Sequence, residues 1–568
     1  MCSTRDNCQL PVYNEKYRLY ASLSFAVLLL GVGVPLWWYT TAVPRVPLPY
    51  SGIARLSDLD MRISTRIIVA TFARENGELL ADEVRAFFAD AEVLKVDVDH
   101  QVISSNLVSR AYTTHDLEKV AATFDLKVGE LLLLEAANLK EDILVGSRRT
   151  IYFSKTSGGA ELVQILSQWI LRDKSLALTK NALAEPTLYS LDEENRRRFP
   201  ASAAYDVLLT LVNPDPESLK IDWNLPRVID EYIEPFLEGL SLIANFSIKS
   251  QWLYLLPLDV TPKQVPDSSP LGRHYALPEN VLPQLVTPLE KKLASQVSLH
   301  PCINLVVYTV PCDKAPLHIY TRTGHRSKSA SNVEAFLSPR WGGVVISNPP
   351  LEVCEEAITK NKETVVVMPE GGTIMGVFLA QLRLLLGIPD ANPIKGAALV
   401  QLENSKPRDW EFDALLRIRT IEQLTSAKLT LQSLSQLLKE ISSIVITETV
   451  GNRIKSALDL VERSAELLER GHLVQGFLLS KEAFVTAEAA FTDPSLLALL
   501  YFPEDQKYAV YVPLFLPIMI PVLLSLKNIY RYFFEKKVNG DMGKEEETLV
   551  EDSEKIKKNE ENVKLKTG

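Results

Sequence analysis

The chain has 568 residues, of which 46% are hydrophobic and 23% are charged, and its net charge is −10. This length allows about three or four domains, and the acidic balance argues against a broad nucleic-acid-binding surface. A mean hydropathy of +0.04 excludes a transporter with many spans and fits a globular body attached to a few spans.

The first predicted element is a membrane span at residues 19–41, behind a short N-terminal segment at 1–18. No charged residue lies between Arg18 and Arg45, and this stretch is long enough to cross roughly 30 Å of hydrocarbon. A cleaved signal peptide is the alternative. However, the apolar run is longer than the usual h-region of about 7–15 residues, and the bulky sequence WWY replaces a small-residue cleavage site. We therefore expect an uncleaved anchor with an aromatic belt at its far end.

Two basic residues, Lys16 and Arg18, precede this span. We expect them to contact anionic lipid headgroups, because each basic residue near such a surface contributes on the order of 1 kcal/mol. The alternative is a solvated flank that only sets the orientation of the span.

The region 42–405 alternates strand and helix patterns. Strands are predicted at RIIVATF, AEVLKVDVD, AYDVLLTLVN, INLVVYTV and GGVVISN. Helices are predicted at SGGAELVQILSQWILRDKSLALTKNAL, RVIDEYIEPFLEGLSLI and GVFLAQLRLLLGI. This alternation predicts an α/β domain with a mixed sheet.

The region 406–492 changes character and predicts a long helical hairpin. Apolar residues recur on one helical face up to a break at Val450-Gly451-Asn452, and the pattern then continues. We expect this hairpin to pack on the sheet as a helical lobe, rather than to form a free coiled coil. Segment 493–507 contains a leucine-rich run that suits a short helix at the membrane interface.

A second span is predicted at residues 508–526. Four basic residues follow it within eleven positions, which places the C-terminus in the cytoplasm. Two spans put both ends on one side, so the domain at 42–507 lies on the non-cytoplasmic side. A removable GPI-attachment signal would end at its hydrophobic tail. Here a Lys- and Glu-rich tail at 527–568 follows, and we expect that tail to be disordered.

Three prolines, Pro513, Pro517 and Pro521, recur every four residues in the second span. Each interior proline leaves a carbonyl without its helical partner, which is costly in lipid. We expect this face to contact partner helices, and the opposite face, with Phe515, Met519 and Val522, to meet lipid. The alternative is a simple anchor, because spans tolerate prolines.

The predicted non-cytoplasmic placement permits N-glycosylation at one sequon and disulfide formation among three cysteines. Asn245-Phe246-Ser247 is the only N-x-S/T sequon, so we expect a glycan on Asn245. Cys302 and Cys312 flank a strand-like run and could pair if the chain turns back, and Cys354 is a third candidate. Any two of the three could form a disulfide, with one thiol left over.

The sequence contains no Walker A loop, G-x-S-x-G, H-E-x-x-H or C-x-x-C motif. Gly371-Gly372-Thr373 follows a strand, but it lacks the rest of a phosphate loop and is interpreted as a turn. His300 and Cys302 suggest a Cys-His pair, yet no activating partner is visible, and no metal-ligand spacing appears. We expect no catalytic, cofactor-binding or metal-binding residues.

Several segments closely resemble the PIG-S family, from the first span through the second. They are PLWWYTT, LPYSGI, LVNPDP, NFS, SPRWGG, FLAQLRLLLGI and FTDPSLLALLYFPEDQKYAVYVPLFLPIMIPVLLSL. This resemblance implies a non-catalytic subunit of the GPI-anchor transamidase of the endoplasmic reticulum membrane. It also implies that a caspase-like partner subunit performs the transfer of GPI to the C-terminus of precursor proteins, with further membrane subunits as partners.

Two observations leave alternatives open. The α/β alternation would also permit a stand-alone, membrane-anchored lumenal hydrolase. The terminal sequence KLKTG has lysines third and fifth from the end. This spacing resembles a dilysine retrieval signal of the endoplasmic reticulum, although a Lys-rich tail gives such matches by chance.

Overall fold

The chain divides into two compact units. One comprises Met1–Pro47, Leu437–Gly451 and Thr492–Gly568, and the other comprises Leu48–Gln436 and Asn452–Phe491. The computed structural model describes residues 12–41, 45–108, 113–137, 139–155, 158–266, 272–326, 333–359, 364–388, 390–402, 404–441, 444–497, 509–517, 519–527, 529–531 and 534. Most of the expected interfacial segment 493–507 and nearly all of the tail 527–568, with its KLKTG end, therefore lie outside the described residues.

The first unit contains the apolar helices near both ends of the chain. At the N-terminal end, α1 (Val12–Ala26), the π-helical η1 (Val27–Gly33) and α2 (Val34–Thr41) follow one another without a break. Within them Leu19–Leu36 has a mean hydropathy of 2.0 and is long enough to cross a membrane. This confirms an apolar helix near the N-terminus.

The second apolar helix is bent. Its two parts, Ala509–Pro517 and Met519–Arg531, meet at 51°, and they have the length and composition of a span only if they are taken as one. Pro521 cannot donate to the carbonyl four residues earlier, and its ring crowds that turn. Prolines are the commonest cause of such bends.

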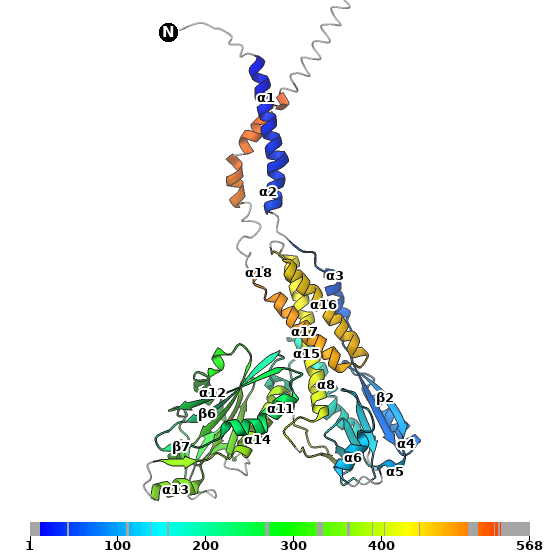
Figure 1. Ribbon diagram of the computed structural model, residues 1–568, viewed down its shortest axis with the longest axis vertical. Coiled ribbons are helices and arrows are strands. Elements are labelled where there is room, and N and C mark those ends of the chain that lie inside the picture. Colours follow the sequence, from blue (N-terminus) through cyan, green and yellow to red (C-terminus); the bar gives the residue numbers. More distant parts are fainter. Residues whose placement is uncertain are drawn as a thin grey trace, which may run out of the picture. The chain divides into compact units, whose positions relative to one another are not determined.

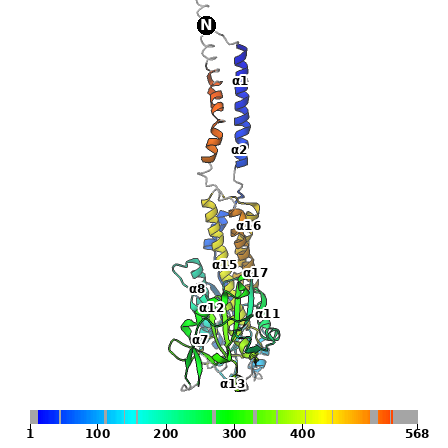
Figure 2. The same ribbon diagram turned by 90° about the vertical axis from the view of Figure 1, so that its left-hand side faces the viewer.

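The two apolar helices run alongside each other within this unit (Figure 2). Ala26 and Val522 are the buried residues among the described parts of the two helices, whereas Pro513, Pro517 and Pro521 are exposed. The expectation that Val522 meets lipid is therefore wrong, because this side chain is enclosed within the unit.

The second unit contains two α/β lobes, which lie on either side of the lower part of α15 (Figure 1). The first lobe has a six-stranded mixed sheet in the order β16-β4-β5-β3-β1-β2. Only β4 and β5 pair antiparallel. The strands are β1 (Ile63–Thr71), β2 (Leu94–Val102), β3 (Leu131–Glu135), β4 (Ile143–Val145), β5 (Thr150–Phe153) and β16 (Ala397–Leu399).

Helices pack on this sheet through regularly spaced apolar residues. In α4 (Arg74–Phe88), Leu80, Val84 and Phe88 are four residues apart and buried. The other helices of this lobe are α3 (Tyr50–Arg55), η2 (Leu56–Asp58), α5 (Ser105–Val108), α6 (Thr114–Ala121), α7 (Gly159–Ile165), η3 (Leu166–Ile170), α8 (Asp173–Ala184) and α9 (Glu193–Arg197).

The second lobe has a five-stranded sheet in the order β13-β14-β11-β6-β8. All pairs are parallel except β13 with β14. The predicted mixed α/β architecture is thus confirmed, but two separate main sheets are present instead of the single mixed sheet that was expected. The strands are β6 (Ala204–Asn213), β8 (Asn245–Tyr254), β11 (Cys302–Thr309), β13 (Val333–Ser338) and β14 (Gly342–Ser347). A two-stranded sheet pairs β7 (Leu219–Ile221) with β15 (Val365–Val367). A three-stranded sheet has β10 (His274–Pro278) between β9 (Lys263–Val265) and β12 (Leu317–Tyr320).

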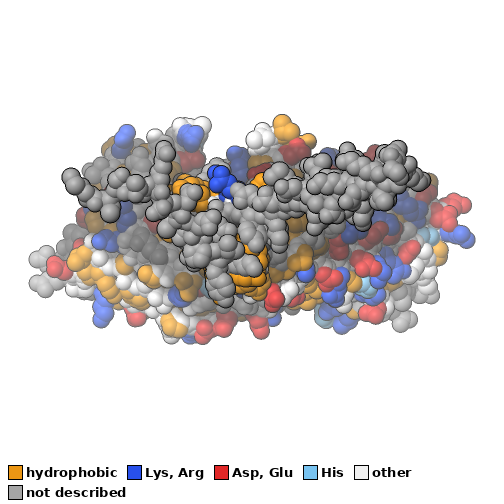
Figure 3. Space-filling model, turned by 90° about the horizontal axis from the view of Figure 1, so that it is seen from above, with side chains coloured by type: hydrophobic (Ala, Val, Ile, Leu, Met, Phe, Trp, Pro, Cys, Tyr) orange, Lys and Arg blue, Asp and Glu red, His pale blue; other side chains and the backbone are white. Residues whose placement is uncertain are grey.

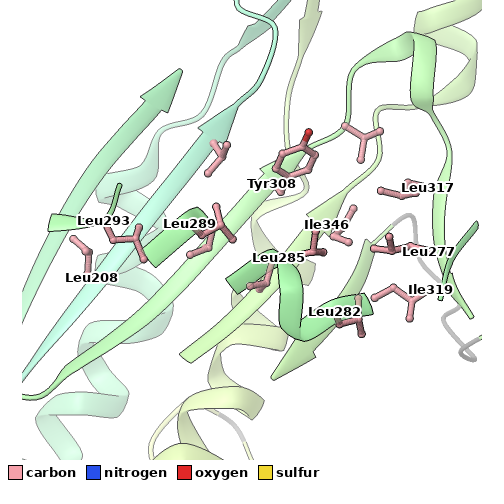
Figure 4. Packing of buried hydrophobic residues seen from close by; sticks show 14 residues of the cluster. Leu208, Leu277, Leu282, Leu285, Leu289, Leu293, Tyr308, Leu317, Ile319 and Ile346 are labelled. Atoms are coloured by element: carbon pink, nitrogen blue, oxygen red, sulfur yellow. The ribbon is translucent and has the colours of Figure 1, made fainter. Parts of the chain in front are cut away.

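One face of the five-stranded sheet carries the main apolar core of this lobe. Leu208, Tyr308 and Ile346 point from the sheet toward Leu282, Leu285 and Leu289 of α12 (Leu282–Glu290), and Leu277, Leu317 and Ile319 of the small sheet extend the cluster (Figure 4). The remaining helices of the lobe are α10 (Leu225–Val228), η4 (Ile229–Ile233), α11 (Glu234–Gly239), η5 (Glu279–Val281), η6 (Ala294–Val297), η7 (Cys312–Lys314), α13 (Leu351–Thr359) and α14 (Gly371–Leu386).

The opposite face of this sheet is covered by α14, and one glycine makes the close contact possible. A Cβ on Gly343 would lie 1.9 Å from Oε1 of Gln381, while the Gln381 amide donates to the Phe336 carbonyl at 3.1 Å. Any larger residue at this position would therefore displace the Gln381 side chain and break its hydrogen bond to Phe336.

The predicted helical hairpin is wrong in one respect, because three helices are present. They are α15 (Asp409–Glu440), α16 (Glu448–Glu469) and α17 (Leu473–Phe491), followed by the short α18 (Pro494–Leu497). The expected break at Val450-Gly451-Asn452 lies inside α16, whose start is set earlier by Thr447. A further break, which the sequence pattern does not predict, lies at Gly471 between α16 and α17. Gly471 has a φ of +80°, a left-handed conformation that often ends a helix and that glycine adopts without steric strain.

Candidate functional site

Helix α15 presents polar residues on two of its sides, and each side contacts a different lobe. Trp410, Asp413 and Arg417 recur at spacings of three and four, so they share one face of a 3.6-residue helix. A second face, roughly a third of a turn or more around the helix from the first, carries Glu411, Arg419 and Glu422. The sequence pattern predicted a helix here, but not that its charged residues would be buried.

The first face binds the six-stranded lobe. The carboxylate of Asp413, which is fully buried, accepts from Arg149 Nε at 2.6 Å and from the Gly129 backbone amide at 3.0 Å. Arg417 donates back to the Gly129 carbonyl at 2.8 Å, and the Trp410 indole donates to the Gly146 carbonyl at 3.1 Å. One stretch of α15 thus contacts the turn between β4 and β5 and the turn before β3.

The second face binds the segments that flank the five-stranded lobe. Arg419 donates to the carbonyls of Phe199 and Leu386, at 2.9 and 3.1 Å. Glu422 pairs with Arg198 at 2.6 Å, and Glu411 pairs with Arg383 of α14 at 2.7 Å. These side chains are almost completely buried, with the exception of Glu422 and Arg383, which are partly exposed.

Burial disfavours the charged form of Arg417. It lowers the pKa of Arg417 to about 10, against a smaller opposing effect of Asp413. A buried cation is tolerated only where carboxylates and carbonyls satisfy it, and removing one member of such a pair typically costs about 3–5 kcal/mol. Helix α15 therefore acts as a strut that joins the two lobes through mutually dependent contacts.

Asn245 is the first residue of β8, an edge strand of the five-stranded sheet. Its side chain and that of Ser247 are exposed, so the sequon is accessible on the folded surface. Glycosylation itself stays a prediction.

The residues expected at the membrane belong to the apolar helices. Lys16 and Arg18 lie on α1, but their side chains are outside the described residues. Pro513, Pro517 and Pro521 lie on the bent second helix, and all three are exposed. Both the lipid contact and the partner-helix contact stay predictions.

Of the three possible disulfides, the structure contains Cys312–Cys354, with 5.5 Å between the Cα atoms. Cys302 is a free thiol. This bridge joins the turn after β11 to α13 across 42 positions of sequence.

The surroundings of Cys302 are not those of an activated nucleophile. Burial raises the pKa of the Cys302 thiol to about 11, so the thiol is protonated at neutral pH, and Cys302 Sγ faces Asn304 rather than a base. Gly371 begins α14 after β15, as a simple turn would. Among the described residues, no group of three or more His, Cys, Asp or Glu side chains could hold a metal ion.

A surface cleft with a volume of about 630 Å³ lies in the first lobe, beside α6. Charges of both signs line it, including Glu118, Arg148, Arg149 and Asp409. Acidic and basic side chains are also interspersed over the view in Figure 3. Neither feature selects a ligand of one charge.

Comparison with known proteins supplies the identity. The family described as phosphatidylinositol-glycan biosynthesis class S protein matches residues 24–536. The rat and human proteins named GPI-anchor transamidase component PIGS are each 35% identical to this chain over 90% of its length and 94% of theirs. The Saccharomyces cerevisiae protein named GPI transamidase component GPI17 is 22% identical over 93% of this chain and 95% of its own. The chain therefore belongs to the PIG-S family.

Proposed function

We propose that this chain is a non-catalytic component of a GPI-anchor transamidase complex in the endoplasmic reticulum. In this role it supports assembly of the complex and the transfer of GPI to the C-termini of precursor proteins. The observation that carries the proposal is the extent of the family match, which runs from residue 24 to residue 536. It includes most of the first apolar helix, both lobes and the second apolar helix.

The packing of α15 supports a scaffolding role. Its buried ion pairs and hydrogen bonds tie two separate α/β lobes to one helix, so surfaces on both lobes keep a fixed relation to each other. A body of this kind can hold partner subunits in register without reacting with substrate. Catalysis is assigned to a caspase-like partner subunit.

The membrane arrangement follows from the two apolar helices and the charges around them. We infer two spans, with both termini in the cytosol and the body in the lumen, because basic residues cluster directly after Leu526. Lys16 and Arg18 contact lipid headgroups, and the face with Pro513, Pro517 and Pro521 contacts partner helices. An unchanged set of co-purified lipids in a Lys16→Ala/Arg18→Ala double variant would contradict the lipid contact.

Purification of the tagged full-length chain in mild detergent tests the proposed function. We expect the other transamidase subunits to co-purify, including a cysteine-protease-like one, and we expect the chain isolated from them to neither cleave nor transfer a precursor. Hydrolysis by the isolated chain, without any co-purified subunit, would favour the stand-alone lumenal hydrolase instead.

A further inference from the structure

Strand β8 is an open edge of the five-stranded sheet. It is ten residues long and pairs along its whole length with β6, and with no other strand in the described part of the chain. Its residues alternate between exposed and half-buried along most of the strand. A long unpaired edge presents a row of backbone donors and acceptors that another extended chain can bind.

Two hydrogen bonds fix which amides face outward. The amide of Asn245 donates to Ala203 O, and the amide of Leu255 donates to Asn213 O, each at 3.0 Å. Because amides in a strand alternate in direction, the odd-numbered residues bond to β6. The even-numbered residues then turn their backbone groups to the open edge: Phe246, Ile248, Ser250, Trp252 and Tyr254.

The other sheet shows how this protein protects an edge. There β2 carries Lys95, Asp97 and Asp99 along its length, and Asp99 pairs with Arg66 at 2.6 Å. Charged residues on an edge strand oppose pairing with another chain. Strand β8 contains one charge, Lys249, which Asp206 neutralises at 2.5 Å, and it contains no proline.

The side chains of β8 indicate the character of the partner. Trp252 and Tyr254 are 39% and 54% exposed, with ring centroids 6.5 Å apart, on the sheet face where Phe246 stacks on Tyr205. On the other face, Asn245 and Ser247 at the start of the strand are polar and exposed. An added strand that alternates apolar and uncharged polar residues would match both faces, and a glycan on Asn245 would project from the face and leave the edge open.

We propose that the edge of β8 binds an extended, uncharged, alternately apolar segment of another transamidase subunit, which adds a sixth strand to the sheet. This inference rests on the proposed function, which supplies the partner subunits. The neutral edge, the outward amides at every second residue and the exposed aromatic pair carry it.

Proline at Ser250 tests the backbone contact. Ser250 is exposed and its amide faces outward, so Ser250→Pro removes a donor from the open edge and leaves the hydrogen bonds to β6 in place. Losing one hydrogen bond and crowding the edge should lower recovery of at least one subunit by about fivefold or more. Ser250→Ala keeps the amide and should recover subunits within about twofold of wild type.

A second variant covers the case in which Ser250→Pro does not fold, as judged by loss of the Cys312–Cys354 disulfide. Tyr254→Lys places a charge on the open edge at an exposed position and should cause the same selective loss. If either variant forms the disulfide and recovers the full set of subunits, the inference is wrong while the proposed function stands. If wild type itself recovers no subunits, the proposed function is wrong.

Cross-linking identifies the occupant. A photoreactive residue in place of Tyr254 should form an adduct with another transamidase subunit, whereas one in place of Leu79, which is 65% exposed in the other lobe, should not form that adduct. Adducts only with the precursor or with a second copy of this chain, or no adduct in the intact complex, would overturn the inference.

Discussion

At the scale of single residues, the disulfide fastens the turn after β11 to α13. It closes a loop of 42 positions, and loss of a bridge of this kind typically costs about 2–4 kcal/mol because the unfolded chain gains freedom. We expect Cys354→Ser to lower the free energy of unfolding by that amount, measured by thermal or denaturant unfolding of the purified chain. Cys302→Ser removes a thiol that is not bridged and should have the smaller effect. Equal effects would contradict this role.

The glycan prediction is also a matter of one residue. Asn245 is exposed at the beginning of an edge strand, where a glycosyl transferase can reach it. We expect Asn245→Gln to migrate faster than wild type by the mass of one glycan, and glycosidase treatment to remove the difference. Identical migration of the two chains before treatment would show that Asn245 is not modified.

At the scale of elements, α15 should be sensitive to loss of one buried charge. Asp413→Ala would leave Arg149 with only the more distant Asp409 carboxylate, at 3.4 Å. It would also leave Arg417 without its nearby carboxylate and the Gly129 amide without its acceptor. The expected cost is about 3–5 kcal/mol, measured by denaturant unfolding or by protease resistance.

The matched control is the same substitution at an exposed ion pair. Asp459 of α16 pairs with Arg463 at 3.3 Å, and both side chains are at least 60% exposed. Asp459→Ala should therefore cost no more than about 1 kcal/mol. If the two variants were equally stable, α15 would not be the strut that its contacts indicate.

The second apolar helix permits a test of the proline face. Pro513, Pro517 and Pro521 are exposed in this chain, and the helix bends between Pro517 and Met519. A partner helix that covers this face could satisfy the freed carbonyls. We expect a chimera with an unrelated, proline-free apolar helix of equal length to insert but to lose transamidase subunits. Full recovery of the subunits by the chimera would show that the helix serves only as a membrane anchor.

The elements also show what the sequence could predict. Strands such as β1, β6 and β11 could be located from the sequence, because each is an apolar, β-branched run that is recognisable from consecutive residues. The buried ion pairs of α15 could not be predicted, because Asp413 and Arg149 are 264 positions apart in the sequence. For the same reason the pairing of Cys312 with Cys354 required the fold. The break at Gly471 was missed although its signal, glycine after a helical run, was present.

At the scale of the whole molecule, the open edge of β8 could not be recognised from its sequence alone. An alternating run predicts a strand, but its place at the edge depends on the order β13-β14-β11-β6-β8. Likewise, the apolar composition of the two terminal helices indicates their affinity for a membrane, whereas the side on which the body lies depends on flanking charge.

The topology gives the last prediction. Lys527 and Arg531 follow the second apolar helix, together with Lys536 and Lys537, and basic residues near a span are retained in the cytosol. With two spans the N-terminus shares that side, and residues 42–507 are enclosed in the lumen. In sealed microsomes we expect an added protease to shorten the chain only at its ends and to leave a protected fragment that carries the Asn245 glycan. Detergent should abolish this protection, which shows that the membrane provides it. Digestion of the body in intact microsomes would contradict the predicted orientation. It would also exclude a lumenal role for the edge of β8, because β8 belongs to that body.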